Sequence, residues 1–475
     1  MTDHPAPASF SEALLPILGL LGLIVYGLML RPALFGQPPM PLEVLFILAA
    51  SLATVAQFVQ GHTWEAIQTS IVNKLASALP AFFILFAIGL IIGSWIVSGT
   101  IPMLVYYGIR IINPTYLYVL AFVVPAIFST LTGTSWGSAG TIGVVLIGIS
   151  GAVGGHMGIT AGAVIGGSYF GDKLSPLSDT TNLAALAADV DLFMHVRSML
   201  YTTVPSAVLA ALIFTAMGFV YPPHASAADL SAIEPFLAEI RSLFAFNPLL
   251  LLPPAIVLYG SLKKKPTIPT ILSSVLTAAL LALLFQRYTA TDVIQTLYKG
   301  FHTDMAVWAP AVSERVQILM NRGGLYALNE SITVAFMVFI YIGVIDNIQA
   351  MPIVVGRLFR FARSRPSVIL ASLAATAVTN AMTSNQYATS FVVGDAFKSK
   401  YDALRIPRQV LSRSLEDAGT MIESIIPWTT TAVFMVGALG VPYADYWHWQ
   451  LLTLINLVVA PALAILGIGC FYEDE

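Results

Sequence analysis

The stretch Gly171-Asp-Lys-Leu-Ser-Pro-Leu-Ser-Asp-Thr180 places two carboxylates, a proline and three hydroxyls inside a long apolar region. Proline lacks a backbone donor and leaves carbonyls of the preceding turn without a helix partner. Because hydrocarbon offers no water to those carbonyls, this stretch is expected to be a broken or re-entrant helix that lines a polar cavity. Its acids are functional candidates, since an ionisable side chain is costly to place in a membrane.

A second stretch of the same kind, Ile422-Glu-Ser-Ile-Ile-Pro-Trp-Thr-Thr-Thr431, overlays the first. Aligning Pro427 with Pro176 gives a separation of 251 positions, since 427 minus 176 is 251. Upstream, a hydroxyl-rich segment overlays in the same order and places Thr134 on Thr383, a separation of 249. Two matching pairs at a nearly constant separation predict an internal repeat.

Positive charges are distributed oppositely in the two repeats. The connector after the first repeat's opening helix has only Arg110, whereas its counterpart carries four arginines between residues 357 and 365. The stretch Ser150 to Met157 has no Lys or Arg, while its counterpart between residues 398 and 413 has five. By the positive-inside rule, the second-repeat loops are cytoplasmic and the first-repeat loops face outward. This distribution predicts an inverted-topology repeat.

The composition indicates a bilayer as the solvent. The 475 residues are 57% hydrophobic and 10% charged, with a mean hydropathy of +0.82. We therefore expect an all-α polytopic membrane protein of two inverted-topology repeats with broken or re-entrant helices and about 11 to 14 membrane segments. The expected divisions are N-terminal helices at 1–77, inverted repeat 1 at 78–197, connecting helices and loops at 198–326, inverted repeat 2 at 327–446 and a C-terminal helix at 447–475.

Location and partners follow from the same features. The short polar start leads into a retained first helix, so we expect a multi-pass protein of the bacterial inner (plasma) membrane with both termini cytoplasmic. The net charge of -3, without a long basic tract, excludes nucleic acid as a partner. A single cysteine, Cys470, excludes an internal disulfide and a thiolate metal site. No cofactor is expected beyond transported or coupling Na+ and H+.

Oxygen atoms of both repeats are expected to form one binding site. A carboxylate in a broken helix holds a cation when ionised and a proton when burial favours its neutral form, so one group binds either ion in turn. Competition of that kind gives antiport. Na+ is expected at Asp172, Asp179 and Ser178. The full ion- or substrate-binding set is Asp172, Ser175, Ser178, Asp179, Thr180, Thr134, Ser135, Asn380, Thr383, Asn385, Glu423 and Thr429.

Structural alternatives exist for several of these groups. Asp172 or Asp179 could pair with Lys173 to hold two half-helices together, and the hydroxyls and amides could simply bond neighbouring helices. Glu416 and Asp417 follow a basic stretch, so a solvated or salt-bridged helix entrance is expected for them.

Three glycines and one histidine have non-catalytic interpretations. Gly158, Gly162 and Gly166 recur every fourth residue, which indicates close helix packing. A surface role is expected for His195, which lies near a predicted membrane edge.

An enzymatic alternative rests on Gly133-Thr-Ser-Trp-Gly137, which matches the G-x-S-x-G pattern of serine nucleophiles. An intramembrane serine hydrolase would need a histidine base deep in another helix, and the downstream apolar segments supply none that can be placed there. The protein is therefore not expected to be an enzyme.

From about Ala87 to Tyr446 the chain resembles the NhaC family of Na+/H+ antiporters. The most specific stretches are Thr132 to Thr141 and Tyr169 to Asn182, and a second-half signature is similar at Leu415 to Thr420 with Pro427-Trp428. The resemblance implies Na+ efflux driven by inward protons, and the wider superfamily implies a possible homodimer. The residues that it places near the site are Asp172, Ser175, Ser178, Asp179 and Thr180.

The chain departs from the family pattern where a substrate would bind. After Pro427-Trp428 the family usually carries an Asn and then a small or Cys residue, whereas this chain has Thr429-Thr430-Thr431. Glu423 stands where a small or neutral residue is more common. The family contains members that exchange malate for lactate, and related proteins carry amino acids. The alternative function is therefore Na+- or H+-coupled exchange of a small carboxylate or amino acid.

Overall fold

The computed structural model describes residues 8–223, 234–309 and 312–472, and these residues form helices joined by turns and loops, without a strand. In this part of the chain, nine helices are long and apolar enough to cross a membrane, or up to twelve if each of three bent helix pairs is one span. The predicted all-α polytopic architecture with broken helices is confirmed. The count overlaps the lower end of the predicted range.

The first half of the chain runs from the N-terminal helices through the first repeat. The N-terminal part contains α1 (Phe10–Ile24), η1 (Val25–Leu30), α2 (Arg31–Phe35) and α3 (Leu42–Val59). The first repeat and the helix after it contain α4 (Trp64–Val97), α5 (Thr100–Ile111), η2 (Pro114–Tyr116), α6 (Leu117–Thr132), α7 (Ser135–Ser138), η3 (Ala139–Gly143), α8 (Val144–Val153), α9 (Met157–Leu174), α10 (Asp179–Ala187) and α11 (Leu192–Val220).

The connecting region and the second repeat follow. The connecting region contains α12 (Glu234–Leu243), η5 (Pro248–Leu251), α13 (Leu252–Leu262), α14 (Thr267–Phe285), α15 (Ala290–Lys299), η6 (Thr303–Met305) and α16 (Glu314–Met320). The second repeat and the C-terminal part contain α17 (Asn329–Asp346), α18 (Ala350–Leu358), α19 (Arg365–Thr383), α20 (Gln386–Ala403), α21 (Arg408–Ala418), η7 (Thr420–Ile425), α22 (Thr430–Leu439), α23 (Tyr443–Tyr446), η8 (Trp447–Trp449) and α24 (Leu451–Leu466).

Backbone landmarks support the internal repeat. Three residues with left-handed φ, at the ends of α6, α8 and α10, each have a left-handed counterpart 251 positions later, at the ends of α19, α20 and α22. The pairs are Gly133 with Ser384, Gly154 with Arg405, and Asp189 with Gly440, and each subtraction gives 251. Since non-glycine residues rarely adopt this conformation, apolar composition alone would not place it at matching positions.

This separation corrects the alignment of the upstream segment. Thr134 corresponds to Asn385 and not to Thr383, because 385 minus 134 is 251. Both residues are helix N-caps, with Thr134 accepting from the backbone N–H of Gly137 and Asn385 from that of Ala388. Equivalent backbone positions therefore start equivalent helices.

Both proline-containing stretches interrupt their helices. In the first repeat, α9 ends at Leu174 and α10 starts at Asp179 after a short non-helical segment. In the second repeat, α21 passes into the 3-10 helix η7, and a bend of 48° separates Arg408–Ile425 from Thr430–Leu439. The helix carbonyls at each break lack the partners of a continuous helix, as the prolines predicted.

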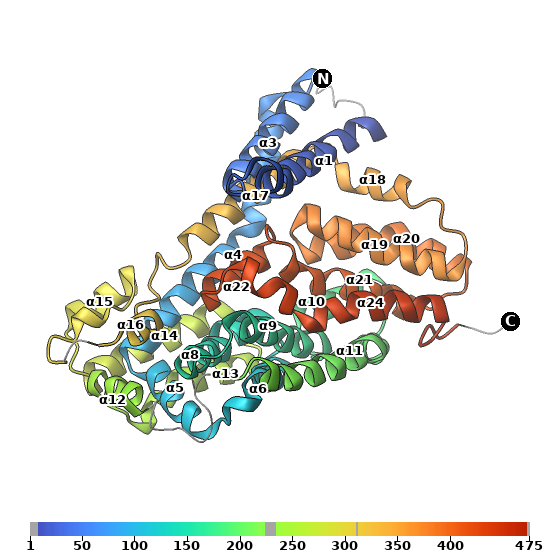
Figure 1. Cartoon of the computed structure of the whole chain (residues 1–475). Coiled ribbons are helices and arrows are strands. Elements are labelled where there is room, and N and C mark those ends of the chain that lie inside the picture. The colour runs from blue at the N-terminus through green and yellow to red at the C-terminus, as the bar shows by residue number, and fades with distance from the viewer. Residues whose placement is uncertain (1–7, 224–233, 310–311, 473–475) are drawn as a thin grey trace.

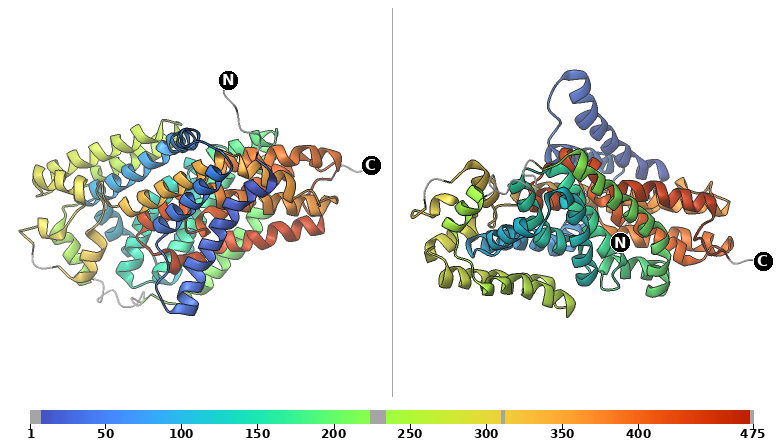
Figure 2. Two further views of the ribbon diagram at one scale, coloured as in Figure 1. Left: turned by 90° about the horizontal axis from the view of Figure 1, so that it is seen from above. Right: turned by 60° about the horizontal axis from the view of Figure 1, so that its bottom comes forward.

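Packing brings the two interrupted segments together. Helix α10 packs against α20 and α21, and α11 packs against α21 and α24. In Figure 1, α19 to α22 of the second repeat and the C-terminal helix α24 lie above α6 and α9 of the first repeat and the following helix α11, and Figure 2 shows the same bundle from two further sides. Each repeat therefore completes the surroundings of the other's break.

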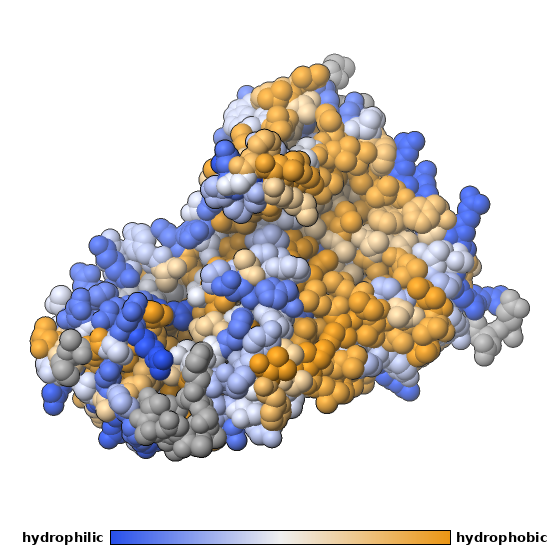
Figure 3. Space-filling model, in the orientation of Figure 1, coloured by the Kyte–Doolittle hydropathy of each residue, from blue (hydrophilic) through white to orange (hydrophobic). Residues whose placement is uncertain are grey.

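The surface has the pattern of a membrane protein. Figure 3 shows hydrophilic residues gathered over α12, α15 and α16 at the left and along the right edge, with an apolar region between them. Large apolar side chains are exposed on the long helices, including Leu212 at 62%, Leu276 at 64% and Val458 at 70%. Apolar side chains of this kind face lipid when the helix spans a bilayer.

Candidate functional site: facing carboxyls at two helix breaks

Asp172 lies in the last turn of α9 and is 4% exposed. Its Oδ2 accepts a hydrogen bond of 2.8 Å from the Ser135 hydroxyl. Its Oδ1 has no hydrogen-bond donor among the described residues. One oxygen of this buried carboxyl is therefore available to a proton or a cation.

Glu423 lies in η7 and holds the equivalent place in the second repeat, since 423 minus 172 is 251. Its Oε1 accepts from the Asn380 amide at 3.1 Å, and its Oε2 accepts from the Thr431 hydroxyl at 2.7 Å. Both oxygens of Glu423 therefore accept hydrogen bonds, whereas only one oxygen of Asp172 does.

Each of these carboxyls faces the start of a helix in its own repeat. The backbone N–H of Ser135 interacts with Asp172, and that of Gln386 interacts with Glu423. Ser135 opens the span Ser135–Val153, and Gln386 opens α20, again 251 positions apart. Free N–H groups at a helix N-terminus favour an anionic group, so the two repeats position their acids by the same means.

Two aromatic residues link the repeats. The hydroxyl of Tyr387 donates to Asp179 of the first repeat, and the indole Nε1 of Trp136 donates to Thr431 of the second at 3.3 Å. Trp136 and Tyr387 are themselves 251 positions apart. Their acceptors Asp179 and Thr431 are 252 positions apart, one more than the repeat separation, so the two contacts are reciprocal to within one residue. Asp179 is exposed, and it interacts electrostatically with both Asp172 and Glu423.

The remaining predicted site residues make local contacts that shape the breaks. Ser178 and Thr429 are the N-caps of α10 and α22, as Thr134 and Asn385 are of α7 and α20. The other three hydroxyls bond within a few residues: Ser175 to the N–H of Leu177, Thr180 to Ser178, and Thr383 to Thr389. Their role as ligands stays a prediction.

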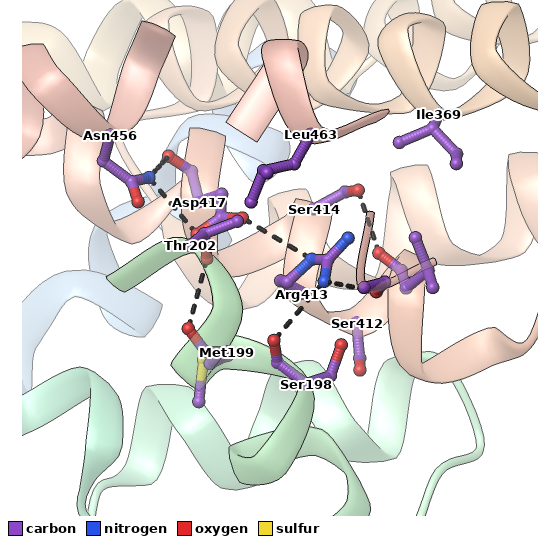
Figure 4. Close-up of polar contacts among 12 residues, drawn as sticks. Ser198, Met199, Thr202, Ile369, Ser412, Arg413, Ser414, Asp417, Asn456 and Leu463 are labelled. Atoms are coloured by element: carbon purple, nitrogen blue, oxygen red, sulfur yellow. Dashed lines mark hydrogen bonds and ion pairs between the residues drawn. The ribbon is translucent and has the colours of Figure 1, made fainter. Parts of the chain in front are cut away.

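Lys173 pairs with neither Asp172 nor Asp179, the partners that the structural alternative gave it. It forms a fully buried ion pair with Asp417 of α21. The same carboxyl accepts from the Thr202 hydroxyl of α11 at 2.9 Å and from the Asn456 amide of α24 at 3.2 Å. Figure 4 shows Thr202 and Asn456 converging on Asp417 with Arg413 alongside. Four helices thus meet at one carboxylate.

Of the two forms predicted for the helix entrance at Glu416 and Asp417, the solvated one is wrong, whereas Asp417 is salt-bridged to Lys173. Their side chains are 0% and 1% exposed, because α21 is enclosed by α11, α19, α20 and α24. The surface role expected for His195 is also wrong. Its ring is buried, and its Nδ1 lies 2.8 Å from the Ser412 hydroxyl. Two adjacent acids so close to a helix break could have indicated that Glu416 and Asp417 are buried. The basic residues before them instead suggested a helix end at the membrane surface.

Two further observations concern metal ions and cavities. Among the residues that the structure describes, no three His, Cys, Asp or Glu side chains converge as metal ligands. A cavity of about 390 Å³ shares no residue with the site just described. It is lined by Ala66, Thr69, Ser70, Asn73, Lys74, Asp346 and Asn347.

The serine of the G-x-S-x-G pattern has a carboxyl as its partner. Ser135 donates to Asp172, whereas a serine nucleophile donates to a general base that is usually histidine. Ser135 therefore belongs to the environment of Asp172.

Comparison with known proteins agrees with these observations. A family model described as the Na+/H+ antiporter family matches residues 167–468. An uncharacterized Na+/H+ antiporter of Haemophilus influenzae is 39% identical over 458 residues, 96% of each chain. The NhaC Na+/H+ antiporter of Bacillus subtilis is 32% identical over 90% of this chain and 92% of its own. The malate-2H+/Na+-lactate antiporter of the same organism is 31% identical over 92% of each.

The family match covers both helix breaks and most of the contacts that surround them, and the relatives align over nearly their whole length. Proteins of this kind are transporters. The chain is a multi-pass membrane protein that belongs to the Na+/H+ antiporter family, in its NhaC branch.

Proposed function

We propose that this protein exchanges Na+ for H+ across the bacterial inner membrane by alternating access, with Asp172 as the carboxyl that binds either ion. The observation that carries the proposal is the oxygen of Asp172 that is buried without a donor, at the break between α9 and α10. The family and the relatives named as Na+/H+ antiporters support the choice of ions.

Competition at Asp172 gives the exchange. A proton on Asp172 neutralises a carboxyl that is otherwise costly to bury, and Na+ with a shell of hydroxyl and carbonyl oxygens neutralises it equally well. The hydroxyls of Ser135 and Ser178 both interact with Asp172 and could contribute to such a shell. Asp179 adds negative charge nearby and favours occupancy by a cation.

The remaining features of the proposal are expectations from the sequence. Both termini are cytoplasmic, the two repeats have opposite orientation, the lipid bilayer surrounds the long helices, and two copies form a homodimer. No cofactor takes part beyond the transported ions.

A second candidate function is coupled exchange of a small organic solute. The relative named as a malate-2H+/Na+-lactate antiporter supports this alternative, and so does the extra carboxylate Glu423 beside two aromatic side chains that cross between the repeats. An amino acid with a positive side chain would suit these acids, whereas an anion would need a cation such as Lys173, which is engaged by Asp417.

The test is transport by purified protein in proteoliposomes loaded with Na+. As Na+ leaves, protons should enter and acidify the lumen in the wild type, and Asp172→Asn should abolish this Na+-dependent proton movement. The exposed acid Glu330 provides the control variant Glu330→Gln, which should transport normally. Full activity of Asp172→Asn would reject the assignment. Malate, lactate and basic amino acids, added in place of Na+, test the second candidate.

A further inference from the structure

Glu416 is a buried acid that the proposed exchange at Asp172 does not use. Its side chain is 0% exposed, and neither Oε1 nor Oε2 has a hydrogen-bond donor among the described residues. The buried hydroxyl of Thr420, one helical turn further on, interacts with Glu416 and has no other partner. Glu416 is thus held in a protein interior beside one neutral hydroxyl, without the several donors that normally accompany a carboxylate.

The charged groups around Glu416 do not supply the missing counter-charge. Lys173 and Asp172 of α9 both interact with it electrostatically, and so does its neighbour Asp417. Lys173, however, is ion-paired with Asp417, and Arg413 lies 3.9 Å from the other oxygen of Asp417.

Figure 4 shows Arg413, Thr202 and Asn456 around Asp417. The other elements that pack on α21 contribute groups that do not donate to Glu416. These groups are His195 of α11, Asp179 of α10, Tyr387 and Tyr401 of α20, Arg365 of α19 and Glu423 of η7. Among its described residues, α24 has no charged side chain.

A carboxylate buried without donor or counter-ion costs far more free energy than the neutral acid in the same place. We propose that Glu416 is a second proton-binding site of the exchanger, protonated in this conformation and coupled to Asp172 through Lys173. The inference rests on the proposed function. It adds that Na+ exchange involves a second proton, held on a different helix from the first.

The coupling is electrostatic. When Na+ binds at Asp172, that carboxyl changes from a neutral acid to an ion pair, its proton leaves, and an oxygen-ligated cation stands near Lys173. The net charge at Asp172 is unchanged by this exchange, but Na+ lies farther from the carboxylate oxygens than the proton did. The larger dipole, with its positive end toward Lys173, raises the positive potential at Glu416 and favours loss of its proton to the solvent-connected side. By linkage, a proton on Glu416 weakens Na+ binding to the same extent. One Na+ thereby displaces two protons, so the proton-loaded and Na+-loaded forms differ by one unit of charge.

The test measures protons released per Na+ bound by full-length protein in weakly buffered detergent solution, with Na+ binding followed separately by thermal shift. Glu416→Gln imitates the neutral acid and should therefore weaken Na+ binding by about tenfold, while proton release per Na+ falls by about half. Glu416→Asp should restore part of the release. Glu330→Gln is the matched control and should behave as the wild type.

Infrared difference spectra provide a readout that does not depend on the folding of Glu416→Gln. Addition of Na+ to the wild type should remove C=O bands of two protonated carboxyls, and Asp172→Asn, which lacks the Na+ ligand, should show neither change. A single band in the wild type, or unchanged proton release by a folded Glu416→Gln, would overturn the second site. Loss of Na+ binding in Glu416→Gln would also overturn it, because Glu416 would then be a ligand. If the wild type released no proton on Na+ addition, the proposed function itself would fail.

Discussion

Asp172 and Glu423 occupy equivalent positions 251 residues apart, and each faces the backbone N–H of the residue that starts a helix of its own repeat. Their hydrogen bonding differs. Both oxygens of Glu423 accept from Asn380 and Thr431, whereas Asp172 accepts from the Ser135 hydroxyl on one oxygen only. The two acids therefore have equivalent backbone positions but different hydrogen bonds. Substitutions of Asp172 and Glu423 should consequently have different effects.

Glu423→Gln should slow Na+/H+ exchange by about tenfold, whereas Asp172→Asn should abolish it. The new amide nitrogen would face the donor of either Asn380 or Thr431, so one hydrogen bond of roughly 1 to 2 kcal/mol is lost without removal of the ion ligand. Initial rates in proteoliposomes at several Na+ concentrations measure the difference. Equal loss in both variants would mean that both acids bind the transported ion.

Tyr387→Phe removes the hydrogen bond from the second repeat to Asp179 of the first. A hydrogen bond to a charged group contributes about 1.5 to 3 kcal/mol. Because about 1.4 kcal/mol corresponds to a factor of ten, loss of this bond should change the KM for Na+ by about tenfold or more. Tyr326→Phe, at an exposed position outside the site, is the control. An unchanged KM would show that the Tyr387 contact has no part in ion binding.

Asp417→Asn should strongly destabilise the fold, because it leaves Lys173 buried without its counter-ion. Breaking a buried ion pair costs about 3 to 5 kcal/mol, and thermal unfolding in detergent should show a clear decrease of Tm. Thr202→Val removes a neutral donor from the same carboxylate and should cost less, about 1 to 2 kcal/mol. If Asp417→Asn were as stable as the wild type, Lys173 would have another partner in the membrane.

The glycines that recur every fourth residue in α9 should differ in their tolerance of alanine. A Cβ on Gly162 would lie 2.4 Å from the carbonyl oxygen of Trp449, whereas the nearest atom to a Cβ on Gly166 is Leu452 Cβ at 3.3 Å. Gly162→Ala should therefore destabilise by about 1 to 3 kcal/mol or more, and Gly166→Ala should destabilise less. Thermal unfolding of the two variants compares them directly. Equal effects would contradict the close approach of α9 to η8.

Asp189, in the loop after α10, should contribute to stability in a pH-dependent way. A hydrogen bond from Lys398 at 3.0 Å, helped by Arg408 at 2.9 Å, lowers the pKa of Asp189 below its ordinary value of 3.8. The folded state therefore favours the ionised form. This contribution is fully present above pH 3.8 and is lost as the pH falls through the lower folded-state pKa.

The Tm difference between the wild type and Asp189→Asn should accordingly be constant near neutral pH and shrink as the pH falls below about 4. High salt should reduce it, because the pair is exposed to solvent. A difference that grows in acid would contradict the assignment.

Much of the fold follows from the sequence. Apolar composition demands a bilayer, and a bilayer permits helices whose backbone groups bond within the chain. Pro176 and Pro427 interrupt two of those helices, and their separation of 251 is the one that the backbone landmarks share. These are local properties, readable from residue type and spacing. The alignment of Thr134 with Thr383 was wrong by two residues, because it followed the hydroxyl content of the two segments. Helix caps and turns show that Thr134 corresponds to Asn385.

The pairing of the buried charges was decided by tertiary structure alone. Lys173 is adjacent in sequence to Asp172 but pairs with Asp417, 244 positions away, and Tyr387 reaches Asp179 across 208 positions. When a helix is apolar on every side, its sequence does not show which neighbouring helix covers each face. The helices that enclose α21 could therefore not be identified from the sequence, and the burial of Glu416 could not be predicted. The sequence determined that ionisable groups would lie in the membrane at two helix breaks. Only helix packing determined which of them meet, because the free energy of a buried charge depends on partners brought from distant parts of the chain.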